Sequence, residues 1–354
     1  MSTMLKGSRE PIGSRYRLAL LDLDGVVYRG RQPVDHAASS IREAQGAGML
    51  VQYTTNNSSR PQSVVARQLR GFGLDVAPER IITSAVVAAR MVARQVPRGA
   101  KVLVLGAEHL REEIAKVGLR IVPASQDRPI AVVQGWYPQL QWSELADVSY
   151  AVEHGALYFV TNRDLTLPQE NGIAPGCGSM IQAVVNATGV EPVCSAGKPE
   201  SAMYDEARAL VAGDDSDPVA RERCLAVGDR LDTDIEAGNR GGYDSMAVLT
   251  GVTNPTELML APPRLRPTYI VRDLRGLNMT QPMPRQMDER CWTCGGQSAS
   301  FAEDGGLRVS DETSIDALRA ACSLAWDMAD RGSAPDSRSL PDFTVESMGV
   351  GAAS

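Results

Sequence analysis

The sequence RLALLDLDGV at residues 17–26 decides the fold expected for this chain. Its apolar part, Arg17–Leu23, is typical of a buried strand in a parallel sheet. Two carboxylates, Asp22 and Asp24, lie at the end of that strand, and Gly25 opens the turn that follows. Because parallel α/β sheets bind ligands at the carboxyl ends of their strands, one carboxylate could attack a ligand there while the other transfers protons. Taken alone, an ordinary acidic loop is the better interpretation.

Short apolar runs and helical patterns alternate along the chain. The strands that we expect after the first lie at residues 49–53, 101–105, 120–122, 130–133, 156–160, 223–227, 243–249 and 269–271. The expected helices lie at residues 35–45, 61–70, 84–95, 107–117, 143–152, 179–187, 200–211 and from about 233. This alternation predicts an α/β fold with a Rossmann-like, doubly wound parallel-sheet core. Residues 1–15 are interpreted as a loose leader and residues 167–178 as a loop.

The composition limits the classes of function. The chain has 354 residues and a formal net charge of −7, which argues against nucleic acid as the main partner, since phosphate backbones bind clustered Lys and Arg. The first 17 residues are polar and lack the apolar core of a signal peptide. No apolar run is long enough for a transmembrane helix, so no membrane insertion is expected. The six cysteines are too sparse for a disulfide framework, and we expect a cytoplasmic protein.

Two polar segments carry groups that suit a phosphate. Residues 54–58 (TTNNS) follow the second predicted strand, and their hydroxyl, amide and backbone N–H groups can donate hydrogen bonds to phosphate oxygens. Taken alone, a polar cap for the next helix is the simpler interpretation. Lys198 lies between Gly197 and Pro199 before a predicted helix, where it can direct one cation to a fixed point. Taken alone, it is an ordinary solvated lysine.

Residues 227–235 (VGDRLDTDI) form the fourth segment of interest. Asp229 ends a predicted strand, so its carboxylate is expected at the ligand-binding edge of the sheet, and carboxylate oxygens are preferred ligands of Mg²⁺. The simpler interpretation is helix capping by Asp232 or Thr233, with Asp234 in the first turn. Together, the four segments offer a nucleophile, an acid, oxygen ligands and a cation. The combination predicts Mg²⁺-dependent phosphoryl transfer.

The ordered motifs DLDGV, TNNS, GKP and GDRLDTD resemble those of the haloacid dehalogenase superfamily of phosphohydrolases. The resemblance covers roughly residues 17–277 and is greatest to the nagD-type branch, which has a large α/β cap. It implies a phosphatase with a catalytic core at residues 15–83 and 191–277 and an inserted cap at residues 84–190. Residues 278–354 are expected to be a linker, a small C-terminal element and a disordered tail.

The resemblance also implies roles for individual residues. Asp22 is expected to be the nucleophile, and Asp24 the general acid and base, which also offers its backbone carbonyl to the metal. Lys198 is expected to neutralise the aspartyl-phosphate intermediate. The implied Mg²⁺ ligands are Asp22, Asp24 and Asp229, supported by Asp234, and the implied substrate contacts are Thr55, Asn56, Asn57 and Gly178.

The substrate and partners are also inferred from resemblance. With its C-terminal extension, the chain resembles glycerol 3-phosphate phosphatases of actinobacteria, which implies glycerol 3-phosphate as the substrate, read by cap residues 162–179. Phosphoglycolate, pyridoxal phosphate, a sugar phosphate or a nucleotide are the alternatives within the fold. A non-catalytic protein that binds a phosphorylated metabolite is the alternative from another class. The expected partner is a small phosphorylated metabolite, and a homodimer is left open.

The C-terminal region contains one further motif and one helical pattern. Residues 291–294 (CWTC) resemble half of a zinc site, but no second Cys or His pair follows at a suitable spacing. Residues 314–328 carry an apolar stripe at helical spacing that includes Trp326. We therefore expect the tail to be a small packing or dimerisation element.

Overall fold

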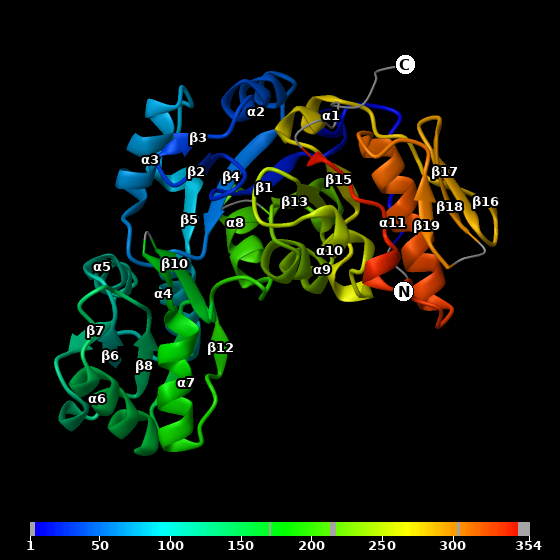
Figure 1. Ribbon diagram of the computed structural model, residues 1–354. Helices are drawn as coiled ribbons and strands as arrows, with labels where there is room; N and C mark the ends of the chain where they lie inside the picture. Colours follow the sequence, from blue (N-terminus) through cyan, green and yellow to red (C-terminus); the bar gives the residue numbers. More distant parts are fainter. Residues whose placement is uncertain (1–3, 170, 213–216, 303–304, 346–354) are drawn as a thin grey trace. The chain divides into compact units, whose positions relative to one another are not determined.

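The computed structural model describes residues 4–169, 171–212, 217–302 and 305–345 (Figure 1). The chain divides into two compact units. The first consists of Met1–Tyr53, Phe72–Leu74 and Arg208–Ser354, and the second of Thr54–Gly71 and Asp75–Ala207. Among the described residues, no helix is both long and apolar enough to cross a membrane.

A six-stranded sheet with the order β15-β14-β13-β1-β4-β5 forms the frame of the fold. Its strands are β1 (Leu18–Asp22), β4 (Leu50–Thr55), β5 (Ile81–Thr83), β13 (Cys224–Gly228), β14 (Asp244–Val248) and β15 (Tyr269–Val271). The pairs β1–β13, β13–β14 and β14–β15 are parallel. The division between the two units falls within β4, after Tyr53. The expected α/β fold with parallel strands is confirmed.

The strand β1 is buried along its whole apolar length. Its four residues Leu18–Leu21 have no exposed surface, as expected for a parallel strand that is covered on both faces. The register pairs Leu18 with Cys224 and Leu21 with Val227 of β13. Asp22 and Asp229 therefore leave neighbouring strands at the same edge of the sheet.

Short helices and turns complete the first unit around this sheet. They are α1 (Ile12–Arg15), α2 (Ala37–Gly46), α9 (Glu236–Gly241), α10 (Pro255–Met259), the turns η3 (Arg221–Arg223), η4 (Leu231–Ile235), η5 (Pro263–Leu265), η6 (Leu274–Asn278) and η7 (Ser337–Ser339), and the hairpin of β2 (Tyr28–Arg29) and β3 (Gln32–Pro33).

The expectation of a loose leader is wrong for residues 4–15. Leu5 and Ile12 are buried, and Ser8 forms a β-bridge with Gln281, so this segment is held by packing and by backbone hydrogen bonds.

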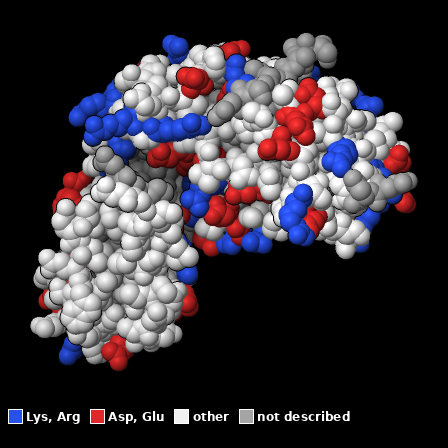
Figure 2. All heavy atoms as spheres, viewed as in Figure 1, with Lys and Arg blue, Asp and Glu red and all other residues white. Residues whose placement is uncertain are grey.

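The second unit contains its own five-stranded parallel sheet, with the order β12-β9-β8-β6-β7. Its strands are β6 (Lys101–Leu105), β7 (Arg120–Val122), β8 (Ala131–Gln134), β9 (Leu157–Val160) and β12 (Cys194–Ser195). Its helices are α3 (Gln62–Gly71), α4 (Ser84–Gln95), α5 (Glu108–Lys116), α6 (Trp142–Glu153), α7 (Cys177–Thr188), most of α8 (Ala202–Ala212) and the turns η1 (Pro78–Arg80) and η2 (Ser125–Asp127). Side chains of α6 and α7 form a core cluster with the sheet. Figure 2 shows few charged side chains over α6 and α7 on the face turned to the viewer, and α7 itself carries none.

A hairpin lies in the segment that we expected to be a loop. The strands β10 (Thr166–Gln169) and β11 (Gly172–Pro175) pair antiparallel, so the loop expectation for residues 167–178 is wrong. Prolines in both strands obscured the pattern, because proline is excluded from central strands but tolerated in a two-stranded ribbon that has two free edges. The short strands β5 and β12 were also not predicted from the sequence. In contrast, α4, β6, β7 and β15 have the predicted bounds.

The C-terminal part of the chain forms a four-stranded antiparallel sheet and a long helix that belong to the first unit. The strands are β16 (Arg285–Asp288), β17 (Cys291–Cys294), β18 (Gln297–Phe301) and β19 (Leu307–Val309), and the helix is α11 (Ile315–Asp330). Part of the segment that we expected to be a linker therefore forms β16. The residues Cys291 and Cys294 lie three apart on one strand, which directs their side chains to opposite faces and prevents them from chelating one ion.

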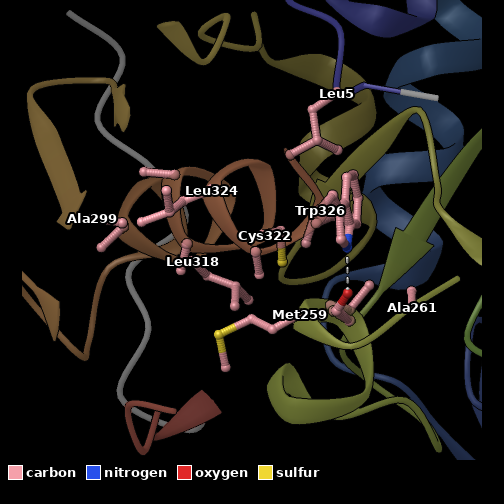
Figure 3. Close-up of a cluster of buried hydrophobic side chains, with 14 of the residues drawn as sticks. Leu5, Met259, Ala261, Ala299, Leu318, Cys322, Leu324 and Trp326 are labelled. Carbon is pink, nitrogen blue, oxygen red and sulfur yellow. Dashed lines mark hydrogen bonds between the residues drawn. The ribbon is translucent and has the colours of Figure 1, made fainter. Parts of the chain in front are cut away.

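The helix α11 is buried against the core of the first unit (Figure 3). Its Trp326 is fully buried and donates a hydrogen bond from Nε1 to the carbonyl oxygen of Leu258 at 2.8 Å. The guanidinium of Arg266 lies 5.4 Å from the centre of the Trp326 ring and pairs with Asp330 at 2.8 Å. The predicted apolar stripe is thus an internal packing surface of this unit.

Candidate active site

Three carboxylates come together in the first unit. One oxygen from each of Asp22, Asp229 and Asp234 lies within 4.8 Å of the others. Asp22 ends β1 and is half-buried, whereas Asp229 and Asp234 are 3% and 1% exposed. No other group of three or more acidic, His or Cys side chains within the described ranges could hold a metal ion in this way.

Glycines make room for this cluster. A Cβ added to Gly25, which has a positive φ of 77°, would lie 2.3 Å from Oδ2 of Asp229. A Cβ at Gly251 would lie 1.8 Å from the same oxygen, and one at Gly228 would lie 2.1 Å from Cβ of Asp234. Because real Cβ atoms do not approach other atoms so closely, each of these positions requires glycine if the carboxylates are to keep their places.

Backbone N–H groups orient two of the carboxylates. The Asp229 carboxylate accepts a hydrogen bond from the N–H of Val252 at 2.8 Å, and the Asp234 carboxylate accepts one from the N–H of Arg230 at 3.1 Å. Asp234 lies in η4, a turn of π-helix, which is a form that occurs often at functional sites. Asp232 caps no helix; it is exposed and pairs with Arg230 at 2.8 Å.

Asp24 is not one of the three clustered carboxylates. It is exposed, and its Oδ1 accepts a hydrogen bond from the N–H of Gly30 at 3.3 Å. The turn after it is held by a bond from the N–H of Gly25 to the Tyr28 carbonyl at 2.7 Å and by one from the Thr250 hydroxyl to the Gly25 carbonyl at 2.6 Å. Its carboxyl group can therefore meet solvent while its backbone is fixed.

The donor set of the cluster fits a small, hard cation. Like charges at this spacing repel each other, and burial of carboxylates is unfavourable unless a positive charge compensates. Mg²⁺ is bound through carboxylate oxygens and water, and it does not require a complete cage of protein ligands. Asp22, Asp229 and Asp234 are the residues that would hold it.

A second polar cluster lies in the second unit, around Lys198. Lys198 is 2% exposed, and its backbone is held by the side chain of Asn56. Asn56 Oδ1 accepts a hydrogen bond from the Lys198 N–H at 2.8 Å, and Asn56 Nδ2 donates to the Lys198 carbonyl at 3.0 Å. Lys198 is therefore buried, and the simpler interpretation as an ordinary solvated lysine is wrong.

The other expected substrate contacts in this unit are placed as follows. The Thr55 hydroxyl is half-buried and accepts a hydrogen bond from the Asn57 N–H at 3.2 Å. Asn57 is exposed, and its Oδ1 accepts bonds from the N–H groups of Ser59 and Arg60 at 2.8 and 3.2 Å, so its side chain supports the start of α3. Gly178 is buried, and its N–H donates to the Asp164 carbonyl at 2.9 Å.

The thiol next to Gly178 is not a nucleophile. Cys177 is 3% exposed, and burial raises the pKa of its thiol to about 12. A thiolate is the reactive form of cysteine, so this side chain stays protonated and inert near neutral pH. The glycines on either side of it pack against the backbone of residues 163–166.

The structure thus gathers the expected site residues into two groups. Asp22, Asp229 and Asp234 form the acidic group of the first unit, and Asn56 and Lys198 belong to the polar group of the second. That both groups act on one phosphoryl group stays a prediction. The sequence did not indicate the roles of Gly251 and Val252, although a glycine soon after the strand next to β13 is a signal that could have identified them.

An α/β core with acidic side chains at the ends of β1 and β13 defines a class of phosphoryl-transfer hydrolase. A family model described as haloacid dehalogenase-like hydrolase matches residues 19–120, and one described as HAD-hydrolase-like matches residues 195–277. The chain belongs to the haloacid dehalogenase-like hydrolases, as the motifs predicted, and it is a phosphatase of this family.

Individual relatives agree with this assignment. The chain is 40% identical to D-glycerol 3-phosphate phosphatase of Mycobacterium tuberculosis over 322 residues, which are 89% of this chain and 87% of the relative. A crystal structure of glycerol phosphate phosphatase from the same organism, in complex with magnesium, is similar with a TM-score of 0.79 and 38% identity, covering 93% of this chain and 97% of that one. The p-nitrophenyl phosphatase from Archaeoglobus fulgidus is similar with a TM-score of 0.68 and 30% identity, over 74% of this chain and 98% of that chain.

Proposed function

We propose that this protein hydrolyses glycerol 3-phosphate to glycerol and inorganic phosphate, with Mg²⁺ as cofactor and Asp22 as the nucleophile. The observation that carries the proposal is the cluster of Asp22, Asp229 and Asp234 at the ends of two neighbouring parallel strands. The substrate follows from the similarity to D-glycerol 3-phosphate phosphatase over most of both chains. Magnesium follows from the donor set and from the similar structure that was solved with this ion.

The reaction is proposed to take two steps. In the first, an Asp22 carboxylate oxygen attacks phosphorus, the phosphorus–oxygen bond to glycerol breaks, and Asp24 donates a proton to the leaving oxygen. In the second, a water oxygen attacks phosphorus and the water gives a proton to Asp24, while the bond between phosphorus and the Asp22 oxygen breaks. This step releases inorganic phosphate and restores the Asp22 carboxylate. The covalent intermediate divides a difficult displacement into two easier ones, and proton transfer contributes about 10²- to 10⁴-fold.

Charge must be compensated for the first step, because a carboxylate approaches a phosphate dianion. Bound Mg²⁺ would supply positive charge to both groups. Lys198 supplies a second positive charge in this proposal, and its buried backbone, held by Asn56, keeps that charge in one place. The exposed position of Asp24 suits a group that must exchange a proton with a leaving group and then with water.

The test is phosphate release by purified protein with Mg²⁺. Wild type should hydrolyse glycerol 3-phosphate with a higher kcat/KM than phosphoglycolate, pyridoxal phosphate, a sugar phosphate or a nucleotide. Asp22→Asn should reduce kcat by about 10⁴-fold or more, since it removes the nucleophile. The matched control is Asp232→Asn, because Asp232 is exposed and lies outside the three-carboxylate cluster. Similar phosphate release by Asp22→Asn and by wild type would refute the assignment of Asp22 as the nucleophile.

We infer that the protein works in the cytoplasm. All six cysteines are free thiols, as expected in a reducing compartment. The homodimer considered from the sequence stays a prediction, which light scattering of the purified protein can test.

A further inference from the structure

The side chain of Asn56 has no N–H left for a phosphate oxygen. A carboxamide has two N–H groups on its nitrogen and one acceptor oxygen. Asn56 Nδ2 donates to the Lys198 carbonyl at 3.0 Å and to Oδ2 of Asp164 at 3.1 Å, and its Oδ1 accepts from the Lys198 N–H. Because phosphoryl oxygens only accept hydrogen bonds, this side chain is better suited to positioning than to the substrate contact expected from the sequence.

Asp164 holds the Asn56 side chain in this orientation. Its Oδ2 accepts hydrogen bonds from Asn56 Nδ2 at 3.1 Å and from Asn162 Nδ2 at 2.7 Å. The Asn162 side chain is itself fixed, since Thr161 Oγ1 donates to Asn162 Oδ1 at 2.9 Å. Hydrogen bonds to a carboxylate are roughly twice as strong as those between neutral groups. Asp164 therefore determines which way the carboxamide of Asn56 faces.

The backbone next to Lys198 is packed against the same residues. A Cβ added to Gly197 would lie 2.7 Å from Asn56 Oδ1, 2.8 Å from the Thr161 carbonyl oxygen and 2.9 Å from Cβ of Asn162. These distances leave no room for displacement of the chain toward the cluster. The position of Lys198 is thus tied to two segments of the second unit that are distant from it in sequence, one at Asn56 and one at residues 161–164.

We propose that Asp164 is a positioning residue for catalysis, which acts on Lys198 through the side chain of Asn56. The inference rests on the proposed function, in which Lys198 offsets the charge of the phosphoryl group. A direct substrate contact by Asp164 is disfavoured, because a carboxylate repels a phosphate dianion and its Oδ2 already accepts two hydrogen bonds. If Asp164 acts through Lys198, the loss of kcat on substitution of Asp164 must depend on the presence of the lysine. A role that is independent of Lys198 would not show this dependence.

A double-mutant cycle tests this dependence. The proteins are wild type, Asp164→Ala, Lys198→Ala and the double variant, assayed with saturating Mg²⁺. The substrate for the cycle is p-nitrophenyl phosphate, a generic monoester, so that an error in the natural substrate does not prevent the measurement. Asp164→Ala should lower kcat by about 10- to 100-fold with little change in KM, since small misplacements of a catalytic group have effects of this size. In the Lys198→Ala background the same substitution should change kcat less than about two-fold.

Equal losses from Asp164→Ala in both backgrounds would overturn the inference, because they would show that Asp164 acts independently of Lys198. A Lys198→Ala variant as active as wild type would instead show that the proposed role of Lys198 fails. If Asp164→Ala does not fold, the cycle is run with Asp164→Asn, which keeps an acceptor oxygen and should lose less activity. The matched control is Asp147→Ala: Asp147 is also half-buried in this unit, but it accepts its hydrogen bonds from Ser125, and its loss should leave kcat unchanged.

Discussion

The substitution Gly251→Ala tests the proposed metal site with a single added carbon. Gly251 follows β14, and its N-terminal neighbour Thr250 holds the turn at Gly25. An alanine Cβ would lie 1.8 Å from Oδ2 and 2.4 Å from Cγ of Asp229. Gly251 does not have a positive φ, so the substitution strains the backbone little, and its effect comes from the collision with this carboxylate.

The size of the displacement follows from these distances. Contacts of a real Cβ essentially never fall below 3.0 Å, so Oδ2 of Asp229 must move from 1.8 Å to at least 3.0 Å, a shift of at least 1.2 Å. Mg²⁺ requires nearly ideal octahedral geometry, with oxygens at about 2.0 to 2.1 Å, so a shift of this size in the Asp229 carboxylate should weaken metal binding. The bond from the Val252 N–H to the same oxygen, 2.8 Å long, is broken as well.

The assay is the dependence of phosphatase activity on Mg²⁺ concentration. Half-maximal activity in Gly251→Ala should require about 10- to 100-fold more Mg²⁺ than in wild type, as for mutations that disturb metal-ligand orientation. The control is Gly46→Ala, because Gly46 ends α2, has no atom near the new Cβ and has no positive φ. A folded Gly251→Ala protein with a Mg²⁺ requirement within about two-fold of wild type would refute the assigned ligand geometry.

Two further predictions concern stability. Trp326→Ala should reduce the free energy of unfolding of the first unit by about 3 to 5 kcal/mol, measured by urea denaturation, because it empties a fully buried site and removes the hydrogen bond from the indole to the Leu258 carbonyl. A change below about 1 kcal/mol would contradict the packing described for α11. Burial lowers the pKa of His109 below its usual value of 6.5, and its Nε2 lies 3.1 Å from the Thr83 hydroxyl. Below pH 6.5 the unfolded chain binds a proton at this residue, whereas the buried ring of the folded state stays neutral. The stabilisation of the folded state by the neutral ring is therefore complete above pH 6.5, and it is lost as the pH falls toward the lowered pKa of the folded state. The melting temperature of His109→Gln should therefore fall less between about pH 7 and about pH 5 than that of wild type. If the two proteins lose the same amount of melting temperature over this range, another group causes the pH dependence.

The acidic centre was predictable because parallel strands obey a simple rule. The apolar runs at β1 and β13 identify buried strands, and their carboxyl ends must meet at one edge once the strands are neighbours. The rule predicts that Asp22 and Asp229 lie at this edge, whereas the role of Asp22 required the resemblance to the family. Asp234 required the resemblance to the family, since its position depends on a turn of π-helix that no sequence pattern indicates.

The polar cluster of the second unit was only partly predictable. Asn56 and Lys198 were identified, but not the direction of the Asn56 side chain, because its partners lie 108 and 142 residues away. A sequence shows which groups can form hydrogen bonds, but it does not show which bonds are already used within the fold. The sequence therefore could not distinguish a substrate contact by Asn56 from a positioning role, because this depends on the partners of its two N–H groups.

The sequence of the C-terminal extension predicted a packing element but not its partners, because its apolar residues pack against residues from several distant segments. Leu231 and Ile235, the first and last residues of the turn that carries Asp234, belong to the same core cluster as Trp326 and Leu258. The N-terminal Leu5 belongs to it as well. Since Asp234 is held by the turn between Leu231 and Ile235, packing by α11 supports a carboxylate of the three-carboxylate cluster. The extension is therefore part of the core that positions Asp234, and it is not a separate appendage.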